Sequence, residues 1–162
     1  MNPSSIPKKI VEFSKTKKKF PDGRIDFTDE RECTVITVFV TYKGKLLLMK
    51  RSNKVSTYRG KWMTVAGYYD EPVPIRQKVE EELREELGVR KYKSMEAFKP
   101  YKHVDKQIGK TWIIHSVLVE LKSRPKIKLD WEHTELKWID PKDLKKYDTV
   151  PSLMKTFKRV FG

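Results

Sequence analysis

Apolar residues recur along residues 75–87 with the spacing of an amphipathic helix. At about 100° per residue they fall on one drifting stripe that can face a core. The residues on this stripe are Ile75, Val79, Leu83 and Leu87. Pro74 precedes the stripe, where the first turn needs no backbone donor, and Gly88 follows it as a C-terminal cap. The pattern therefore predicts both the helix and its two ends.

The rest of the chain alternates between β-branched or aromatic runs and polar segments. Such runs predict strands, and they cover residues 33–42, 45–50, 61–66, 94–101, 111–121 and 131–139. Lys43 and Gly44 separate the first two runs, which are therefore predicted to form a hairpin with its turn at these residues. Residues 102–110 are charged and are expected to form a polar loop, and a closing helix is expected to begin at Pro151.

Length and composition indicate one compact domain. With 162 residues, of which 38% are hydrophobic, the chain is large enough to bury a core. Residues 1–24 are polar and rich in lysine, so we interpret them as a basic N-terminal arm, either loosely held or packed as a short helix. The single domain is then expected to cover residues 25–162.

The formal net charge of +14 favours binding partners that carry negative charge. A strongly basic surface attracts nucleic acid, and RNA is a possible partner, but the same field attracts any phosphate-rich small molecule. Cys33 is the only cysteine, which excludes an internal disulfide and favours a cytoplasmic setting. No apolar run is long enough for a membrane span, so no membrane partner is expected.

An acidic patch on the predicted helix stands out in this basic chain. Glu82, Glu85 and Glu86 fall within an arc of about 100° beside the apolar stripe. Like charges at this distance destabilise one another unless a cation compensates, and carboxylates are ligands that Mg²⁺ or Mn²⁺ prefers. The alternative is a solvated face in which Lys78 pairs with Glu82 and Glu80 pairs with Arg84.

The segment around this patch, GYYDEPVPIRQKVEEELREELGV over residues 67–89, resembles the signature of the Nudix hydrolases. That pattern is Gly, five residues, Glu, seven residues, then Arg-Glu-aliphatic-any-Glu-Glu-any-Gly-aliphatic. It places its glycines on Gly67 and Gly88. Its isolated glutamate falls on Val73 and its arginine on Glu81, which are the two departures. The resemblance implies an α+β fold, an α-β-α sandwich with a central mixed sheet.

The resemblance also implies an activity, namely Mg²⁺-dependent hydrolysis of the diphosphate bond in a nucleoside diphosphate linked to another group. Such a pyrophosphohydrolase acts on an acid anhydride. The expected metal ligands are Glu82, Glu85 and Glu86, joined by the main-chain carbonyl of Ala66 or Gly67. Mn²⁺ is a possible substitute for Mg²⁺.

Further site residues are expected outside the helix. Glu132 is the first choice for the base that accepts a proton from water, with Glu82 as the alternative base, and Glu135 is the second choice for a late carboxylate. The substrate-binding residues are expected to be Arg51, Arg59 and Gly67, because paired hydrogen bonds from arginine suit phosphate.

Two other functions fit the same sequence. The first is a catalytically inactive Nudix-fold module that binds RNA or a nucleotide. The second is an isopentenyl-diphosphate isomerase, for which Cys33 is the only available catalytic cysteine, although a small buried core residue explains it better. The departures at Val73 and Glu81 leave the support of the patch to other residues, and Lys78 or Arg76 is expected to supply it. The substrate, the number of metal ions and the choice between monomer and homodimer stay open.

Overall fold

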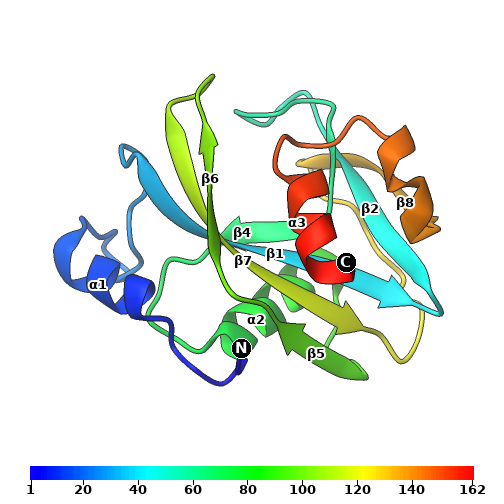
Figure 1. Ribbon diagram of the computed structural model, residues 1–162, viewed down its shortest axis with the longest axis horizontal. Helices are drawn as coiled ribbons and strands as arrows, with labels where there is room; N and C mark the ends of the chain where they lie inside the picture. Colours follow the sequence, from blue (N-terminus) through cyan, green and yellow to red (C-terminus); the bar gives the residue numbers. More distant parts are fainter.

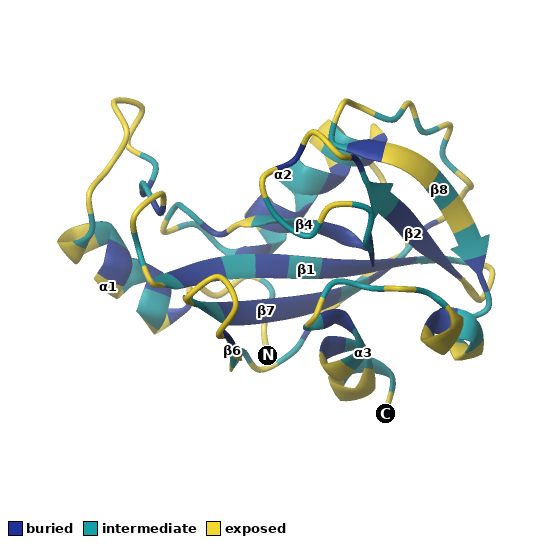
Figure 2. Ribbon diagram, turned by 90° about the horizontal axis from the view of Figure 1, so that it is seen from above, coloured by how far each residue is buried: buried dark blue, intermediate teal, exposed yellow.

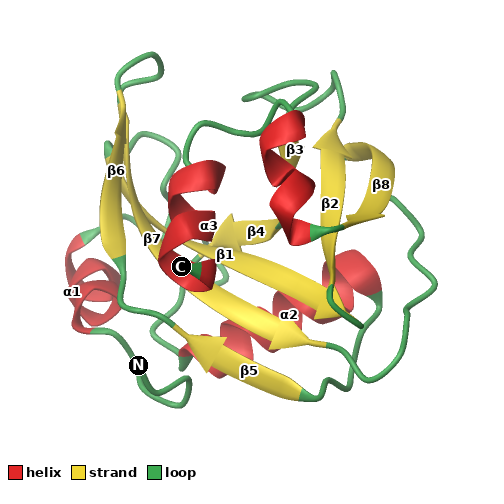
Figure 3. Ribbon diagram, turned by 45° about the vertical axis from the view of Figure 1, so that its right-hand side comes forward, coloured by secondary structure: helices red, strands yellow, loops and turns green.

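The computed structural model describes residues 1–162, and its centre is a single mixed β-sheet (Figure 1). The strands are β1 (Glu32–Tyr42), β2 (Lys45–Arg51), β3 (Trp62–Met63), β4 (Val65–Tyr68), β5 (Ser94–Ala97), β6 (Tyr101–Asp105), β7 (Lys110–Glu120) and β8 (His133–Ile139). The long central strands β1 and β7 run parallel, and every other pair is antiparallel. Strand β8 lies beside β2 at one end of the sheet, and β5 and β6 both pair with β7 at the other (Figure 3).

Helices cover both faces of the sheet. The helices are α1 (Lys8–Thr16), α2 (Ile75–Leu87) and α3 (Leu153–Phe161), with a 3₁₀ turn over Pro141–Lys146. Helix α2 and helix α3 lie on opposite sides of β1 and β7 (Figure 2). Two apolar cores result, because alternate residues of a strand face opposite sides. Val38 packs toward α2 in the larger core, whereas Phe39 packs toward α3 in the smaller one. The predicted α-β-α sandwich with a mixed sheet is confirmed.

Helix α2 begins and ends where the sequence predicts. Gly88 caps it in the left-handed conformation with φ +67°, which a glycine adopts without strain. Pro74 is the N-cap and offers no side-chain hydrogen bond. The first backbone donors of the helix instead reach the N-terminal segment: the N–H of Arg76 donates to the carbonyl of Pro3 at 2.8 Å. The N-terminal segment therefore satisfies groups that a helix start leaves unpaired.

Residues before β1 pack onto the sheet rather than extending from it. Ile10 and Phe13 of α1 are buried in the larger core, together with Ile25 and Phe27. Figure 1 shows α1 close to the start of β1. The segment thus takes the packed form of the two that the sequence allows, and the division of the chain at residue 24 stays a prediction.

The structure corrects four of the predicted elements. The run 61–66 is two short strands, β3 on β2 and β4 on β1. The run 94–101 ends early as β5, and most of the expected loop 102–110 is a β-hairpin made by β6 and β7. Its polar residues misled the prediction because one face of β6 is solvated, as edge strands often are. Strand β8 begins at His133 rather than at residue 131. None of the helices is long and apolar enough to cross a bilayer.

Candidate active site

A pocket of about 410 Å³ opens at the end of β4. Its floor comes from the middle of β1, and its walls come from β7, from the loop between β2 and β3, and from the turn before β8. Among its lining residues are Arg51, Gly67 and Glu132, which are three of the predicted site residues. Residues expected to act together thus share one cavity although they lie up to 81 positions apart in the chain.

Gly67 joins this pocket to the acidic helix. It lines the pocket, and the carboxylate of Glu82 lies directly against its backbone. A Cβ atom built on Gly67 would lie 2.6 Å from Oε1 of Glu82, closer than Cβ atoms approach other groups in proteins. Glycine therefore suits this position because the Glu82 carboxylate fills the space of a side chain, and not because of the backbone angles. A side chain here would displace that carboxylate.

Glu86 is the most buried carboxylate of the patch. Its Oε2 atom is enclosed and has no hydrogen-bond partner. Burial raises the pKa of Glu86 to about 9, and the charges of Glu82, Glu132 and Asp130 add to the shift. Burial also raises the pKa of Glu82 to about 7, with Lys78 acting in the opposite direction. Both shifts show that negative charge on this face is poorly compensated by the protein itself.

These carboxylates fit a hard divalent cation. An enclosed carboxylate oxygen without a partner is a group that a cation would satisfy, and oxygen ligands are what Mg²⁺ takes. Glu85 is exposed on the same helix, one position before Glu86. The side chains do not already form a closed shell, since no three acidic, histidine or cysteine groups gather at metal-binding spacing. Their convergence on one cation therefore requires side-chain rotation, which glutamates on a helix face can perform.

Glu132 lies in the turn that precedes β8. Its backbone carbonyl accepts a hydrogen bond of 2.7 Å from the N–H of Ser52, which anchors this turn to the end of β2. The charge of Glu132 acts on both Glu86 and Arg51. The second candidate, Glu135, instead pairs with Lys50 at 3.4 Å and stays half exposed. The geometry therefore favours Glu132 over Glu135 as the late carboxylate beside the patch.

The two predicted arginines have different surroundings. The Nε atom of Arg51 donates to the carbonyl of Thr57 at 2.9 Å, and its guanidinium lines the pocket. Burial lowers the pKa of Arg51, and the charge of Glu132 opposes this. Arg59 donates to the carbonyl of Val55 at 2.7 Å, is exposed, and does not line the pocket. Only Arg51 is thus brought to the cavity.

Aromatic residues that the sequence interpretation did not single out form one side of the pocket. The Tyr58 hydroxyl donates to Asp105 at 2.5 Å and accepts from the indole N–H of Trp112 at 3.2 Å. These bonds connect the loop after β2 to the β6–β7 hairpin. Tyr58 has φ +52°, a conformation that a bulky residue rarely adopts. Tyr68 is 45% exposed and lies 6.3 Å from Trp112 between ring centroids. In the sequence, the only sign of this aromatic side of the pocket is the aromatic content of these segments.

Cys33, the candidate catalytic cysteine of an isomerase, and Val73, a departure from the family pattern, both lie outside the pocket. Cys33 is completely buried at the start of β1, and burial raises the pKa of its thiol. Its environment is that of a core residue. The side chain of Val73 packs against the larger core, and its carbonyl accepts a hydrogen bond from the Tyr69 hydroxyl. An apolar residue at this position is therefore part of the packing of the loop before α2.

Comparison with known proteins gives a consistent result. The family model described as the NUDIX domain matches residues 30–160. Nucleoside triphosphatase NudI of Escherichia coli is 21% identical over 135 residues, which cover 79% of this chain and 96% of that protein. The MutT NUDIX hydrolase of Burkholderia pseudomallei superposes with a TM-score of 0.69 at 23% identity, over 81% of this chain and 99% of its own. The NUDIX domain of Shewanella oneidensis NrtR, solved with ADP ribose, gives a TM-score of 0.66 at 14% identity, over 93% and 96% of the two chains.

Proposed function

Since this chain belongs to the NUDIX domain family, we propose that it is a Mg²⁺-dependent pyrophosphohydrolase that cleaves the diphosphate bond of a nucleoside diphosphate linked to another group. One observation carries the proposal. Gly67 lines the cavity, and the Glu82 carboxylate lies against the same glycine. A substrate in the cavity would therefore lie next to the acidic patch.

The carboxylates of Glu82, Glu85 and Glu86 would hold the cation, together with the main-chain carbonyl of Ala66 or Gly67. Bound there, Mg²⁺ would neutralise the negative oxygens of the diphosphate. Glu86 fits this role because its Oε2 atom is enclosed and unpartnered. Mn²⁺ would fit the same oxygen ligands.

The remaining steps belong to side chains around the cavity. The Arg51 guanidinium would bind a phosphate oxygen, since its planar fork suits paired hydrogen bonds. Glu132 would accept a proton from the water that attacks phosphorus, with Glu82 as the alternative base. The new bond forms between water oxygen and phosphorus, and the bridging P–O bond breaks with its electron pair leaving on oxygen. A raised pKa near neutrality, as for Glu82, suits a group that exchanges protons at physiological pH.

The nucleoside would lie against the aromatic wall. Tyr68 and Trp112 line the cavity, and stacking of a base on an aromatic ring tolerates any base. The nucleoside triphosphatase and the ADP ribose complex among the similar proteins support a nucleotide-type substrate. The group attached to the second phosphate is left open by these residues.

The test is a hydrolysis screen with and without Mg²⁺. It should include nucleoside triphosphates, nucleotide sugars, dinucleoside polyphosphates, ADP ribose and 5′-triphosphorylated RNA. Glu85→Gln should lose most of the Mg²⁺-dependent turnover without unfolding, because Glu85 is exposed. Glu80→Gln is the matched control on the same helix, since Glu80 contacts Tyr92 instead of the patch. Undiminished turnover in Glu85→Gln would contradict the proposal.

A second candidate is an inactive NUDIX module that binds RNA, and the net charge of +14 favours it. It would show RNA affinity that falls steeply with salt, because released counterions drive such binding. No substrate of the screen would then be hydrolysed with Mg²⁺ present.

A further inference from the structure

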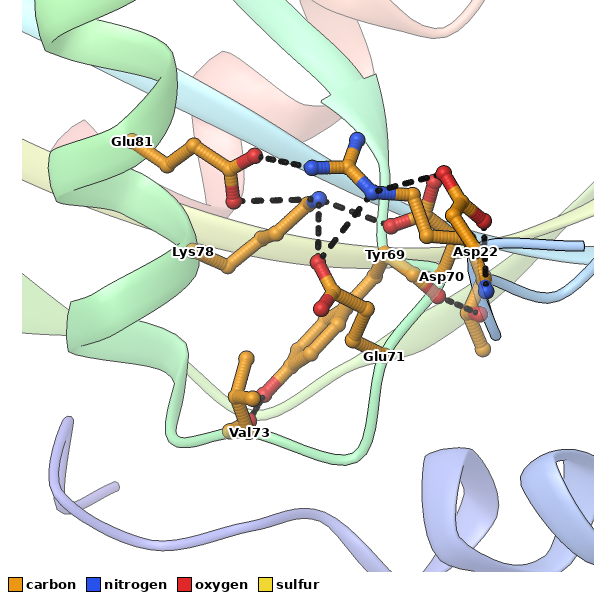
Figure 4. Close-up of polar contacts among 9 residues, drawn as sticks. Asp22, Tyr69, Asp70, Glu71, Val73, Lys78 and Glu81 are labelled. Carbon is orange, nitrogen blue, oxygen red and sulfur yellow. Dashed lines mark hydrogen bonds and ion pairs between the residues drawn. The ribbon is translucent and has the colours of Figure 1, made fainter.

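A buried lysine lies at the centre of an ion cluster beside the acidic patch. The side chain of Lys78 is 1% exposed. Its Nζ atom lies 2.7 Å from Asp70, 3.4 Å from Glu81 and 3.5 Å from Glu71 (Figure 4). An ammonium group without such partners would be costly to bury, because it leaves water behind. The cluster therefore compensates Lys78 fully and fixes the position of each acid.

The second cation of the cluster comes from the N-terminal segment. Nη2 of Arg24 lies 2.7 Å from Oε1 of Glu81, and its Nε atom lies 3.6 Å from Glu71. The backbone next to Arg24 is held as well, since the N–H of Ile25 donates to the carbonyl of Asp70 at 2.9 Å. Arg24 of the N-terminal segment and Lys78 of α2 thus each donate a hydrogen bond to one carboxylate oxygen of Glu81.

Glu81 precedes Glu82 on α2, so the ion pairs of Glu81 also affect the position of the glutamate patch. Successive side chains leave a helix about 100° apart, so Glu81 lies beside Glu82 and the ion pairs of Glu81 restrain the helix at Glu82. The Glu82 carboxylate meets the Gly67 backbone on its other side. Lys78 also lies one turn before Glu82, where i, i+4 neighbours interact. The patch is therefore held between the ion cluster and β4.

We propose that Arg24 and Lys78 are positioning residues that hold the glutamate patch of α2 in the orientation required to bind a divalent cation. Glu81 is their link to Glu82, and a segment that precedes the matched family region supplies one of the two cations. Arg76, the other residue expected to support the patch, takes no part: it contacts the Tyr92 hydroxyl at 2.8 Å. The inference rests on the proposed function in that the patch is taken as the metal site.

The same contacts could serve the stability of the fold alone. A structural role predicts that removing the pair lowers the free energy of unfolding and leaves cation affinity unchanged. A positioning role predicts that cation affinity falls as well. Outer partners of metal ligands typically contribute about 10- to 100-fold to metal affinity or activity. A charge-swap cycle separates the two roles.

The experiment compares Arg24→Glu, Glu81→Arg and the double variant that carries both changes. Mn²⁺ binding to each protein is measured by electron paramagnetic resonance, and unfolding by urea is measured in parallel. Each single variant should bind Mn²⁺ about 10-fold more weakly, and the double variant should recover part of the affinity, because the Arg24–Glu81 pair is restored with reversed polarity whereas Lys78 then faces an arginine. Arg76→Gln is the control and should bind as the wild type does.

If the charge reversals do not fold, Arg24→Gln, Glu81→Gln and their double variant give the same cycle. The double should then cost no more Mn²⁺ affinity than Glu81→Gln alone, since Glu81→Gln already breaks the contacts of Glu81 with both Arg24 and Lys78. Unchanged Mn²⁺ affinity in folded single variants, additive losses in the double, or no Mn²⁺ binding by the wild type would each overturn the inference. A wild type that shows the expected Mn²⁺ pattern but hydrolyses no substrate would uphold the inference and contradict the proposed hydrolysis.

Discussion

The Glu82 carboxylate occupies the space in which Gly67 would carry a side chain, with Oε1 only 2.6 Å from the position of a Cβ. We expect Gly67→Ala to move this carboxylate out of place. The obstructing group is the end of a flexible side chain, so the free energy of unfolding should change by less than about 1.5 kcal/mol. Turnover with Mg²⁺ should fall by about 100-fold, as small misplacements at reacting centres do.

The control for this variant is Gly67→Ala combined with Glu82→Gln. Since the alanine acts through Glu82, the combination should be no less active than Glu82→Gln alone. Wild-type turnover in Gly67→Ala would show that the close approach has no role in the site.

Replacing Glu86 by glutamine should affect stability in opposite directions with and without Mg²⁺. Burial raises the pKa of Glu86 to about 9 and its enclosed Oε2 atom has no partner, so folding at pH 7 without metal must protonate this carboxyl; Glu86→Gln removes that cost and should raise the free energy of unfolding by about 1–3 kcal/mol. With Mg²⁺ at 100 times its dissociation constant, the wild type should gain about 2.7 kcal/mol, and the variant much less. Thermal unfolding with EDTA or Mg²⁺ measures both, and Glu80→Gln should respond to Mg²⁺ as the wild type does. An equal Mg²⁺ response in Glu86→Gln would remove Glu86 from the ligands.

His115 should make the fold sensitive to acid. Burial lowers its pKa to about 4, below the ordinary value of 6.5, and neither ring nitrogen has a partner. The unfolded chain takes up a proton below pH 6.5 that the folded chain takes up only near pH 4. Stability contributed by neutral His115 is therefore present above pH 6.5 and is lost as the pH falls toward 4, by up to roughly 3 kcal/mol.

His115→Phe keeps a ring against Tyr69 and removes the titrating group. Urea unfolding at pH 7 and pH 5 should therefore show a smaller difference for this variant than for the wild type. His103→Gln, on the partly exposed strand β6, should keep the wild-type difference. Identical pH dependence in His115→Phe and the wild type would contradict the assignment.

The hydroxyl of Tyr58 should matter for substrate affinity more than for the chemical step. Tyr58→Phe removes the bonds to Asp105 and Trp112 that join two walls of the cavity. We expect KM to rise several-fold with kcat nearly unchanged, and the free energy of unfolding to fall by about 1–3 kcal/mol because buried Asp105 loses a donor. Tyr92→Phe breaks comparable bonds away from the cavity and should leave KM unchanged. A fall in kcat alone would refute this role.

The sequence predicts elements well where one face is strictly apolar. The stripe on α2 fixed both ends of that helix, because Pro74 and Gly88 agree with the periodicity. The strand β6 was missed because its outward residues are polar, and a charged run then resembles a loop. In each case the burial of one face of the element, which the sequence shows only indirectly, decided the outcome.

The candidate site was predictable only in part for a similar reason. Local spacing brought out Glu82, Glu85 and Glu86, since neighbours on a helix are set by the sequence. The contact of Arg24 with Glu81 could not be inferred, because it spans 57 positions and depends on how the N-terminal segment folds back. Tyr58 was missed for the same reason, since its partner Asp105 lies 47 positions away.

The complete burial of Cys33 gives the protein a practical advantage for spectroscopy. A buried thiol with a raised pKa reacts poorly with alkylating reagents. A cysteine introduced at an exposed position of the loop after β2, such as Asn53, would then be the only thiol that a maleimide dye modifies. Fluorescence from that single label would test whether the loop moves when the proposed nucleotide substrate is added, without any change to the native cysteine.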